Sequence, residues 1–222
     1  MRYDQQAIAN AQRRSFQALS SPFFEDGHGK QMVDTNNKPI PNPYFVNPLS
    51  ISEPAQIIQE LPFVNSQNAF IFDFSLTAPQ ATQFLGNIAL GKNNVLAQYA
   101  FQFFLGYGAA ANNRVYQSFG NIQADDSIYD GVLQMKMEQE TLVDLVPMRK
   151  FKDVGQSATE FDPNMGMVLT NPVRLINGNL GRFQIIINLT NPINNLILSP
   201  NLFLSMRMEG SFGQASSIAT KH

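Results

Sequence analysis

The chain has 222 residues, enough to bury a substantial core, and its 15 basic and 17 acidic side chains leave a net charge of −2. A net charge so close to zero excludes a broad basic field for attracting nucleic acid. The complete lack of cysteine excludes disulfides, thiolate zinc sites and cysteine nucleophiles.

Charged residues make up only 14% of the chain, against roughly 25% in typical soluble domains. Amide side chains take their place, in the pairs Asn36-Asn37, Asn93-Asn94, Asn112-Asn113 and Asn194-Asn195. Amides form hydrogen bonds without the desolvation cost of a charge, which suits surfaces that another protein covers. A biased source genome explains the same composition equally well, so composition alone does not decide.

Residues 4–20 are expected to form a short helix with Asp4 as its N-cap. One side of this helix would carry Ile8, Ala11, Phe16 and Leu19. The N-terminal segment contains no apolar run of 7–15 residues, so we expect no secretory signal. No window approaches the roughly 18 apolar residues of a membrane span.

Residues 21–65 are expected to be irregular because prolines interrupt them throughout. These prolines are Pro22, Pro39, Pro41, Pro43, Pro48, Pro54 and Pro62. Proline at this density opposes both a helix and a central strand. An irregular arm of this length suggests that the segment lies across a neighbouring subunit or is partly disordered.

From residue 66 the apolar pattern has a period of two, which predicts β-strands. The expected strands are 66–77, 95–108, 114–119, 132–140, 141–146, 167–176, 182–190 and 202–209. In the second of these, one face is expected to carry Val95, Ala97, Tyr99, Phe101, Phe103 and Leu105. Strands without intervening helices indicate an antiparallel sandwich or barrel.

The fold class predicted from this pattern is all-β, an antiparallel, jelly-roll-like sandwich of eight strands with a mostly irregular N-terminal arm. The arm would span residues 1–65, the sandwich domain 66–213 and a C-terminal tail 214–222. Residues 185–187 and 202–204 are apolar on both faces, so the second face needs cover. The arm, a long loop or another subunit would supply it.

Candidate chemistry is sparse. The histidines are His28 and His222, and neither stands in a recognisable nucleophilic triad. Asp125-Asp126 would suit acid–base work only if both side chains shared a face, and neighbours on an extended chain do not. We therefore expect no enzyme activity, no catalytic residues, no metal site and no cofactor.

Two short basic clusters stand out, Arg2 with Arg13 and Arg14, and Arg149 with Lys150 and Lys152. A few cations support only weak, salt-sensitive and non-specific contact with phosphates or anionic lipids. A solvated helix face and a loop are the competing interpretation.

The stretches FIFDFSLT, YAFQFFLGYG, RFQIIINLTNP and LFLSMRMEG, following a proline-rich arm, resemble jelly-roll coat proteins of small icosahedral viruses, of the tailless-bacteriophage type. The resemblance covers residues 66–213 and the arm. It implies a structural virion protein that self-assembles into an icosahedral capsid, made in the host cytoplasm and located in the virion. The chain is short for a double jelly roll, so a minor or vertex protein is as consistent as the main shell protein.

Implied partners are copies of the chain and other capsid proteins, with weak non-specific contact between the basic N-terminus and genome or internal membrane. No small-molecule substrate is expected. Candidate assembly contacts are Arg13, Arg14, Phe23, Phe24, Tyr44, Phe45 and Phe203. The alternative function is a monomeric ligand- or carbohydrate-binding β-sandwich module.

Overall fold

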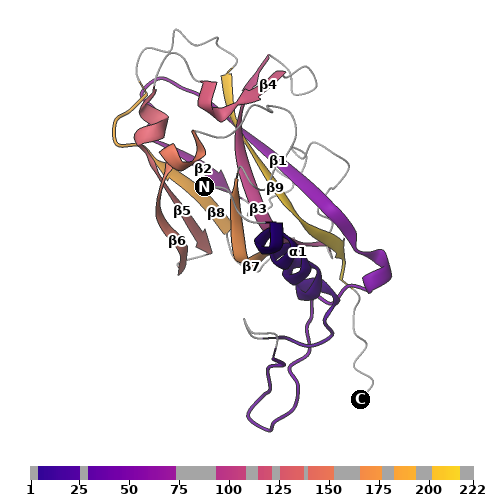
Figure 1. The fold of residues 1–222 in the computed structure, drawn as a ribbon. Coiled ribbons are helices and arrows are strands. Elements are labelled where there is room, and N and C mark those ends of the chain that lie inside the picture. Colours follow the sequence, from indigo (N-terminus) through magenta and orange to yellow (C-terminus); the bar gives the residue numbers. More distant parts are fainter. Residues whose placement is uncertain are drawn as a thin grey trace.

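A computed structural model of the chain describes residues 5–25, 30–73, 94–108, 115–121, 126–137, 140–152, 166–176, 183–193 and 202–215. These ranges contain two antiparallel β-sheets and one α-helix (Figure 1). The prediction of an all-β antiparallel sandwich is confirmed.

The N-terminal helix α1 (Gln5–Ser20) matches the expected helix. Its buried residues are Ile8, Ala11, Ser15 and Leu19. Ser15 therefore takes the place in which Phe16 was expected, because spacings of three and four residues define a helix face. Asp4, the expected N-cap, lies outside the described residues.

The larger sheet has five strands. They are β1 (Ser52–Pro62), β9 (Leu202–Gln214), β3 (Asn94–Tyr107), β4 (Val115–Ser118) and β7 (Met167–Ile176). The smaller sheet has four strands. They are β2 (Ala69–Asp73), β8 (Phe183–Asn188), β5 (Val132–Met137) and β6 (Glu140–Pro147). Every strand expected after residue 66 is present.

The order of strand pairing follows a rolled hairpin. Strand β1 pairs with β9, β2 with β8, β3 with β7 and β5 with β6, so partners nest from the outside of the chain inward. Rolling such a hairpin also brings β9 beside β3 and β8 beside β5, as observed. This is jelly-roll connectivity, with β4 as an additional strand on the end of β3.

Strand β1 corrects the expectation that residues 21–65 lack regular structure. It pairs with β9 along its length, apart from a bulge between Ser52 and Ala55. Pro54 falls in that bulge, Pro62 ends the strand, and β1 lies at the sheet edge. Proline is tolerated in all three settings, so the proline pattern excluded a central strand but not this one.

Strand β3 changes its inward face halfway, which makes the expected single apolar face wrong. Phe101, Phe103 and Leu105 belong to the core between the sheets, whereas Val95 and Ala97 pack on the other side. A single face had been expected for all of them. The alternation therefore reverses within the strand.

A β-bulge at Tyr99 causes this reversal. The pairing of β3 with both β7 and β9 shifts register between Gln98 and Ala100. Tyr99 and Ala100 both pack with Ala11 of α1. One extra residue moves every later side chain to the opposite face.

The core between the sheets is built largely from aromatic rings. Phe103 contacts the rings of Phe72, Phe101, Phe119 and Phe151. The Phe103 and Phe151 rings meet edge to face, with centroids 5.1 Å apart. Burying each such side chain contributes about 1.5–3 kcal/mol, so these rings hold the two sheets together.

Candidate functional site

Helix α1 covers the outer face of the larger sheet through a buried polar contact. The Ser15 hydroxyl lies 2.5 Å from the Ala97 carbonyl oxygen and accepts a hydrogen bond of 3.0 Å from the Ser211 amide. The Ser211 hydroxyl in turn donates to a carboxylate oxygen of Glu53. Helix α1 thus covers the Ser211 end of β9, whereas residues 202–204, for which the sequence demanded cover, lie at the other end of that strand.

A second polar contact lies one turn away on the same helix. Gln12 donates to the Tyr99 hydroxyl at 3.0 Å, and Tyr99 donates to Glu209 at 2.8 Å. Burial raises the pKa of Tyr99 above its ordinary value, and the Glu209 carboxylate raises it further. Tyr99 therefore keeps its proton and serves as a fixed donor under the helix.

After α1 the chain forms a projecting loop, defined here as residues 22–25 and 30–42. Isolated bridges join Phe23 to Pro41 and Val33 to Pro39. At its tip, Asp34 accepts hydrogen bonds from the Asn36 and Lys38 amides at 2.8 and 2.9 Å. Backbone pairing and a capped turn therefore give the loop a defined path.

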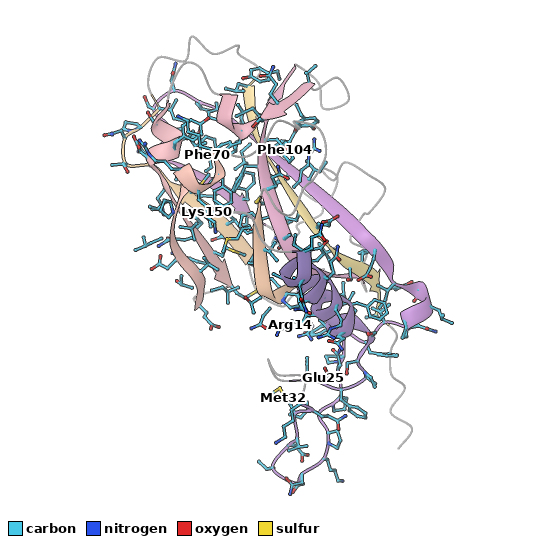
Figure 2. All side chains as sticks on the ribbon, in the orientation of Figure 1. Arg14, Glu25, Met32, Phe70, Phe104 and Lys150 are labelled. Atoms are coloured by element: carbon cyan, nitrogen blue, oxygen red, sulfur yellow. The ribbon has the colours of Figure 1, made fainter. Side chains whose placement is uncertain are left out.

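The projecting loop covers almost none of its own sandwich. Every residue from Lys30 to Pro39 is exposed. Met32 and Val33 are 46% and 48% exposed. Figure 2 places Met32 and Glu25 beyond the end of α1 and away from both sheets.

The base of the loop is fixed to the C-terminal end of α1. Asn42 is fully buried, and its amide donates to the carbonyls of Ala18 at 3.2 Å and Ser21 at 2.9 Å. Arg174 of β7 also donates to the Ala18 carbonyl, at 3.2 and 3.3 Å. Burial lowers the pKa of Arg174 below its ordinary value.

An apolar groove of about 770 Å³ runs along β7, where the two sheets open at one side of the sandwich. Its lining from the strands is mainly aliphatic and thioether, including Met135, Met137, Leu142, Val143, Met167, Leu169 and Val173. Phe24, at the base of the projecting loop, and Tyr44, which follows the loop, also line the groove. Their rings meet edge to face with centroids 6.4 Å apart.

The structure brings several of the sequence-predicted contact residues to this groove. Phe24 and Tyr44 line it, and Arg14 donates at 2.9 Å to the carbonyl of Thr170, another lining residue. The Arg174 guanidinium lies 5.4 Å from the centre of the Phe24 ring. These residues form one cluster at the junction of α1, the loop and β7.

The other predicted contact residues lie apart from the groove. Phe23 and Phe45 are partly buried at the base of the loop, and Arg13 is exposed on α1. Phe203 is opposite Pro62 and Gly106 in the larger sheet. Their role in assembly stays a prediction.

Sequence reasoning missed the strand residues of the groove. The methionines at 135, 137 and 167 were expected in strands but not assigned to a site. A concentration of methionine at strand positions is the signal that was available, since its flexible side chain suits adaptable apolar surfaces.

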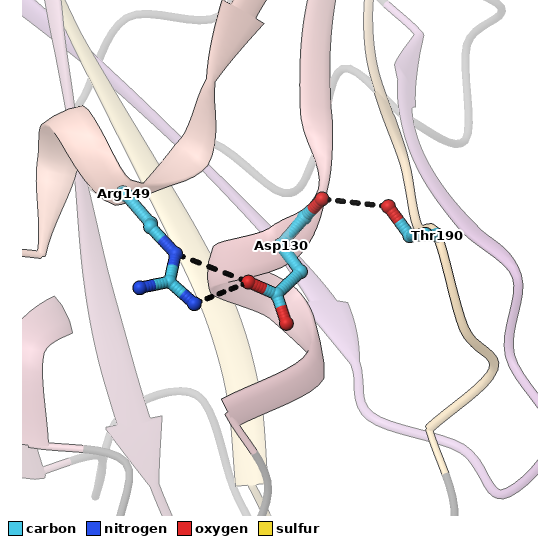
Figure 3. A network of polar contacts seen from close by, with 3 residues as sticks. All are labelled: Asp130, Arg149 and Thr190. Atoms are coloured by element: carbon cyan, nitrogen blue, oxygen red, sulfur yellow. Dashed lines mark hydrogen bonds and ion pairs between the residues drawn. The ribbon is translucent and has the colours of Figure 1, made fainter.

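The second basic cluster makes local contacts (Figure 3). Arg149 forms an ion pair with Asp130, with nitrogen–oxygen distances of 2.5 and 3.0 Å. Thr190 donates to the Asp130 carbonyl at 2.8 Å. The Lys152 ammonium lies 4.3 Å from the centre of the Tyr129 ring. These contacts favour a local structural role over phosphate binding.

Arg207 of β9 lies on the outer face of the larger sheet, away from the two basic clusters of the sequence. The Arg207 guanidinium lies between the rings of Phe104 and Tyr116, at 4.2 and 4.5 Å from their centres. Tyr116 donates to Glu60 at 2.9 Å. Burial lowers the pKa of Arg207, and the two rings and the acidic neighbour compensate the buried charge.

Among the described residues, no three His, Asp or Glu side chains gather as a metal site would require. Asp126 begins a short 3₁₀ helix (Asp126–Asp130), while Asp125, His28 and His222 lie outside the described residues. None of the helices in the described ranges is long and apolar enough to cross a membrane.

No protein-family model matches the chain, and no curated protein matches it. Among solved structures it is similar to one described as a Nora virus structure, with 13% sequence identity and a TM-score of 0.28. The match covers 76% of this chain and 60% of the other, so the chain spans less than two thirds of that structure's length. A similarity at this level establishes neither a family nor a function.

Proposed function

We propose that the chain is a structural protein of an icosahedral virus shell that assembles through contacts with copies of itself and other shell proteins. The projecting loop is the observation that carries this proposal. Backbone hydrogen bonds fix the path of the loop, yet its residues from Lys30 to Pro39 are exposed. Ordering a loop costs conformational entropy, and a neighbouring subunit on the loop would offset that cost.

The sandwich and α1 support the same proposal. Jelly-roll connectivity is common in viral capsid domains, although the fold also serves lectins and cupins. The outward face of α1 is rich in amides, with Gln5, Gln6, Asn10, Gln12 and Gln17 exposed. Such a surface hydrogen-bonds to a neighbouring protein without burying many charges.

In this proposal the chain is located in the virion, and its sandwich is the rigid part of each shell subunit. Many weak contacts between subunits add by multivalency, so no single interface has to be large. The assignment to tailless bacteriophages rests on the sequence resemblance alone. Contact with genome or membrane has little support, because Arg14 is bound to the Thr170 carbonyl.

The apolar groove favours a second candidate, a monomeric module that binds a small apolar ligand. A volume of about 770 Å³ lies within the range of ordinary ligand sites. The two functions differ in their dependence on concentration. Assembly predicts large particles as the protein concentration rises, whereas the ligand-binding module predicts a monomer throughout.

The mass distribution of the purified full chain therefore tests the proposal. We expect mass photometry and light scattering across a concentration series to show discrete oligomers or closed shells above the 24.8 kDa monomer. A monomer at every concentration, alone and with the other shell proteins of its source virus, would overturn the proposal. Thermal stabilisation by apolar ligands would then support the second candidate.

A further inference from the structure

Arg174 is a cation in the wall of the apolar groove that lacks a counter-ion among the described residues. It lines the groove, is half-buried and forms no ion pair with any carboxylate in the described ranges. Its Nε and Nη2 atoms both donate to the Ala18 carbonyl. An arginine has five N–H donors, so three of them, on Nη1 and Nη2, have no partner in the part of the chain that the structure describes. Burial lowers the pKa of Arg174, and a cation partly removed from water is stabilised by an anion beside it.

Tyr44 supplies a second donor at the same end of the groove. Its phenol is close enough to Arg174 to act electrostatically on the pKa of that residue. Within the described ranges the Tyr44 hydroxyl has no hydrogen-bond partner. The Phe24 ring lies 5.4 Å from the Arg174 guanidinium and fixes it on one side. Arg174 and Tyr44 are named here the donor corner of the groove, and the donor corner matches a small anion.

Away from the donor corner the lining is mainly aliphatic and thioether, with Met135, Met137, Leu142, Val143, Met167, Leu169 and Val173. The pairing of β7 with β3 gives the length of this apolar part. Arg174 is opposite Ala97, and Met167 is opposite Phe101. Four residues of an extended strand separate these two positions by at most about 13 Å. An extended alkyl chain of about ten carbon atoms has this length, because each carbon–carbon bond of about 1.5 Å advances the zigzag chain by slightly less.

We propose that the groove binds a fatty-acid-like ligand, an alkyl chain of about ten carbon atoms that ends in a carboxylate. The carboxylate accepts charge-assisted hydrogen bonds from Arg174 and a further hydrogen bond from the Tyr44 hydroxyl. The alkyl chain lies along the apolar lining, where the methionine side chains adapt to its shape. The volume of about 770 Å³ accommodates such a chain.

The donor corner decides between this ligand and others that would fill the same volume. A neutral apolar ligand leaves the three remaining N–H donors of Arg174 without an acceptor, and a cationic amphiphile is repelled by the guanidinium. The inference specifies a ligand for the second candidate function, but it does not require that the chain be monomeric. Binding and assembly are measured separately, so the failure of one leaves the other in place.

Calorimetric titration of the wild-type full chain with three head groups on the same alkyl chain tests the head-group contact. The probes are decanoate, decan-1-ol and decyltrimethylammonium, all below their micelle concentrations and near neutral pH. Decanoate is expected to bind at one site per chain, roughly tenfold more tightly than decan-1-ol, because hydrogen bonds between ions are stronger than neutral ones. Decyltrimethylammonium is expected to bind more weakly than the alcohol. Acetate has the head group without the chain and is expected to show no saturable binding.

Arg174→Gln removes the cation, and Arg13→Gln is its matched control. Arg13 is exposed on α1 and is absent from the groove lining, so both variants lose one positive charge but only one changes the donor corner. We expect Arg174→Gln to bind decanoate and decan-1-ol equally, and Arg13→Gln to keep the roughly tenfold preference for decanoate.

Leu142→Asp tests the apolar wall without changing an anchor of the fold, because Leu142 is 40% exposed. Leu145→Asp is its control, since Leu145 is 61% exposed on the same strand and is not a lining residue. A carboxylate in the lining repels decanoate and hydrates the wall. We therefore expect Leu142→Asp to weaken decanoate binding about tenfold or more, and Leu145→Asp to leave it unchanged.

Each outcome decides on a stated part of the inference. Equal affinity of the wild type for decanoate and decan-1-ol, or a preference that survives in Arg174→Gln, overturns the carboxylate contact. Unchanged binding in Leu142→Asp, or no saturable binding of decanoate by the wild type, overturns the site itself. If Arg174→Gln does not fold, the head-group series on the wild type and the Leu142 variant still decide.

Discussion

The Ser15 hydroxyl of α1 lies 2.8 Å from the Ser211 hydroxyl of β9, although 196 residues separate them along the chain. Both residues are fully buried. On the same helix, Ala11 packs with Tyr99 and Ala100, and Leu19 packs with Val46, Val95 and Ala97. Hydrogen bonds as well as apolar packing therefore set the position of α1 on the sheet.

Replacing Ser15 by alanine is expected to destabilise the protein by about 1–3 kcal/mol, because it leaves the Ala97 carbonyl and the Ser211 amide buried without their partner. Urea unfolding measures this loss. Ser20→Ala, a change on the same helix at a partly buried site, is the control and is expected to cost less than about 0.5 kcal/mol. Equal effects of the two changes would contradict a special role for Ser15.

Tyr99 is expected to make stability depend on pH above about pH 10, the ordinary tyrosine pKa. Its pKa is raised in the folded state, so the unfolded state loses the proton first. Stability is unaffected below that pH and falls above it, by up to about 1.4 kcal/mol per pH unit. Urea unfolding from pH 9 to 11 should show this slope in the wild type and a shallower one in Tyr99→Phe. The raised pKa of Tyr107 is common to both proteins and cancels. Parallel pH profiles would refute the prediction.

Gly210 is expected to tolerate no larger residue. A Cβ atom there would overlap the Ala97 carbonyl oxygen of the neighbouring strand, at a point where both flanking pairings contain bulges. Gly210→Ala should cost about 1–3 kcal/mol through overpacking. Ser205→Ala, on the same strand, removes a buried hydroxyl that has no hydrogen-bond partner in the described part of the chain and should be neutral or slightly stabilising. Calorimetric melting temperatures of the two variants, moving in different directions, would check this.

Gln98 is expected to be a site at which an apolar residue stabilises the fold. It is fully buried, and among the described residues neither polar atom of its amide group has a hydrogen-bond partner. Gln98→Met keeps the length of the side chain, removes the unsatisfied groups and should gain about 1–3 kcal/mol. Gln102→Met on the same strand is the matched control, because Gln102 is buried with an interaction partner. Chemical denaturation should show that the control variant loses stability. A gain in stability in both variants would show that the added hydrophobicity, and not the removal of unsatisfied polar groups, stabilises the fold.

The strands could be predicted from sequence because alternation of apolar residues is a local property. Residues 66–209 contained the pattern, and the structure has strands there. The bulge at Tyr99 was not predictable in this way, because an extra residue is recognised only against its partners on β7 and β9. β1 was missed because the argument from Pro54 and Pro62 did not distinguish an edge strand from a central one.

The candidate site could be predicted only in part. Phe24 and Tyr44 were chosen as apolar residues of the arm, and they line the groove. The groove itself depends on the rolled hairpin, which brings β7 near β5 and β6 across the opening between the sheets. Local patterns do not specify pairing order, so the groove became visible only in three dimensions.

The central position of β9 has a consequence for synthesis. This strand lies between β1 and β3 in the larger sheet, yet it is the last of the described strands to be made. Until the ribosome has completed residues 202–214, β1 and β3 have no strand to join them, and both keep open edges. Folding of the larger sheet must therefore wait until residues 202–214 have been synthesised, and non-local pairing of this kind is slow and prone to aggregation. A chaperone that shields open strand edges would accordingly be expected to raise the yield of nascent chains more than that of refolded, full-length protein.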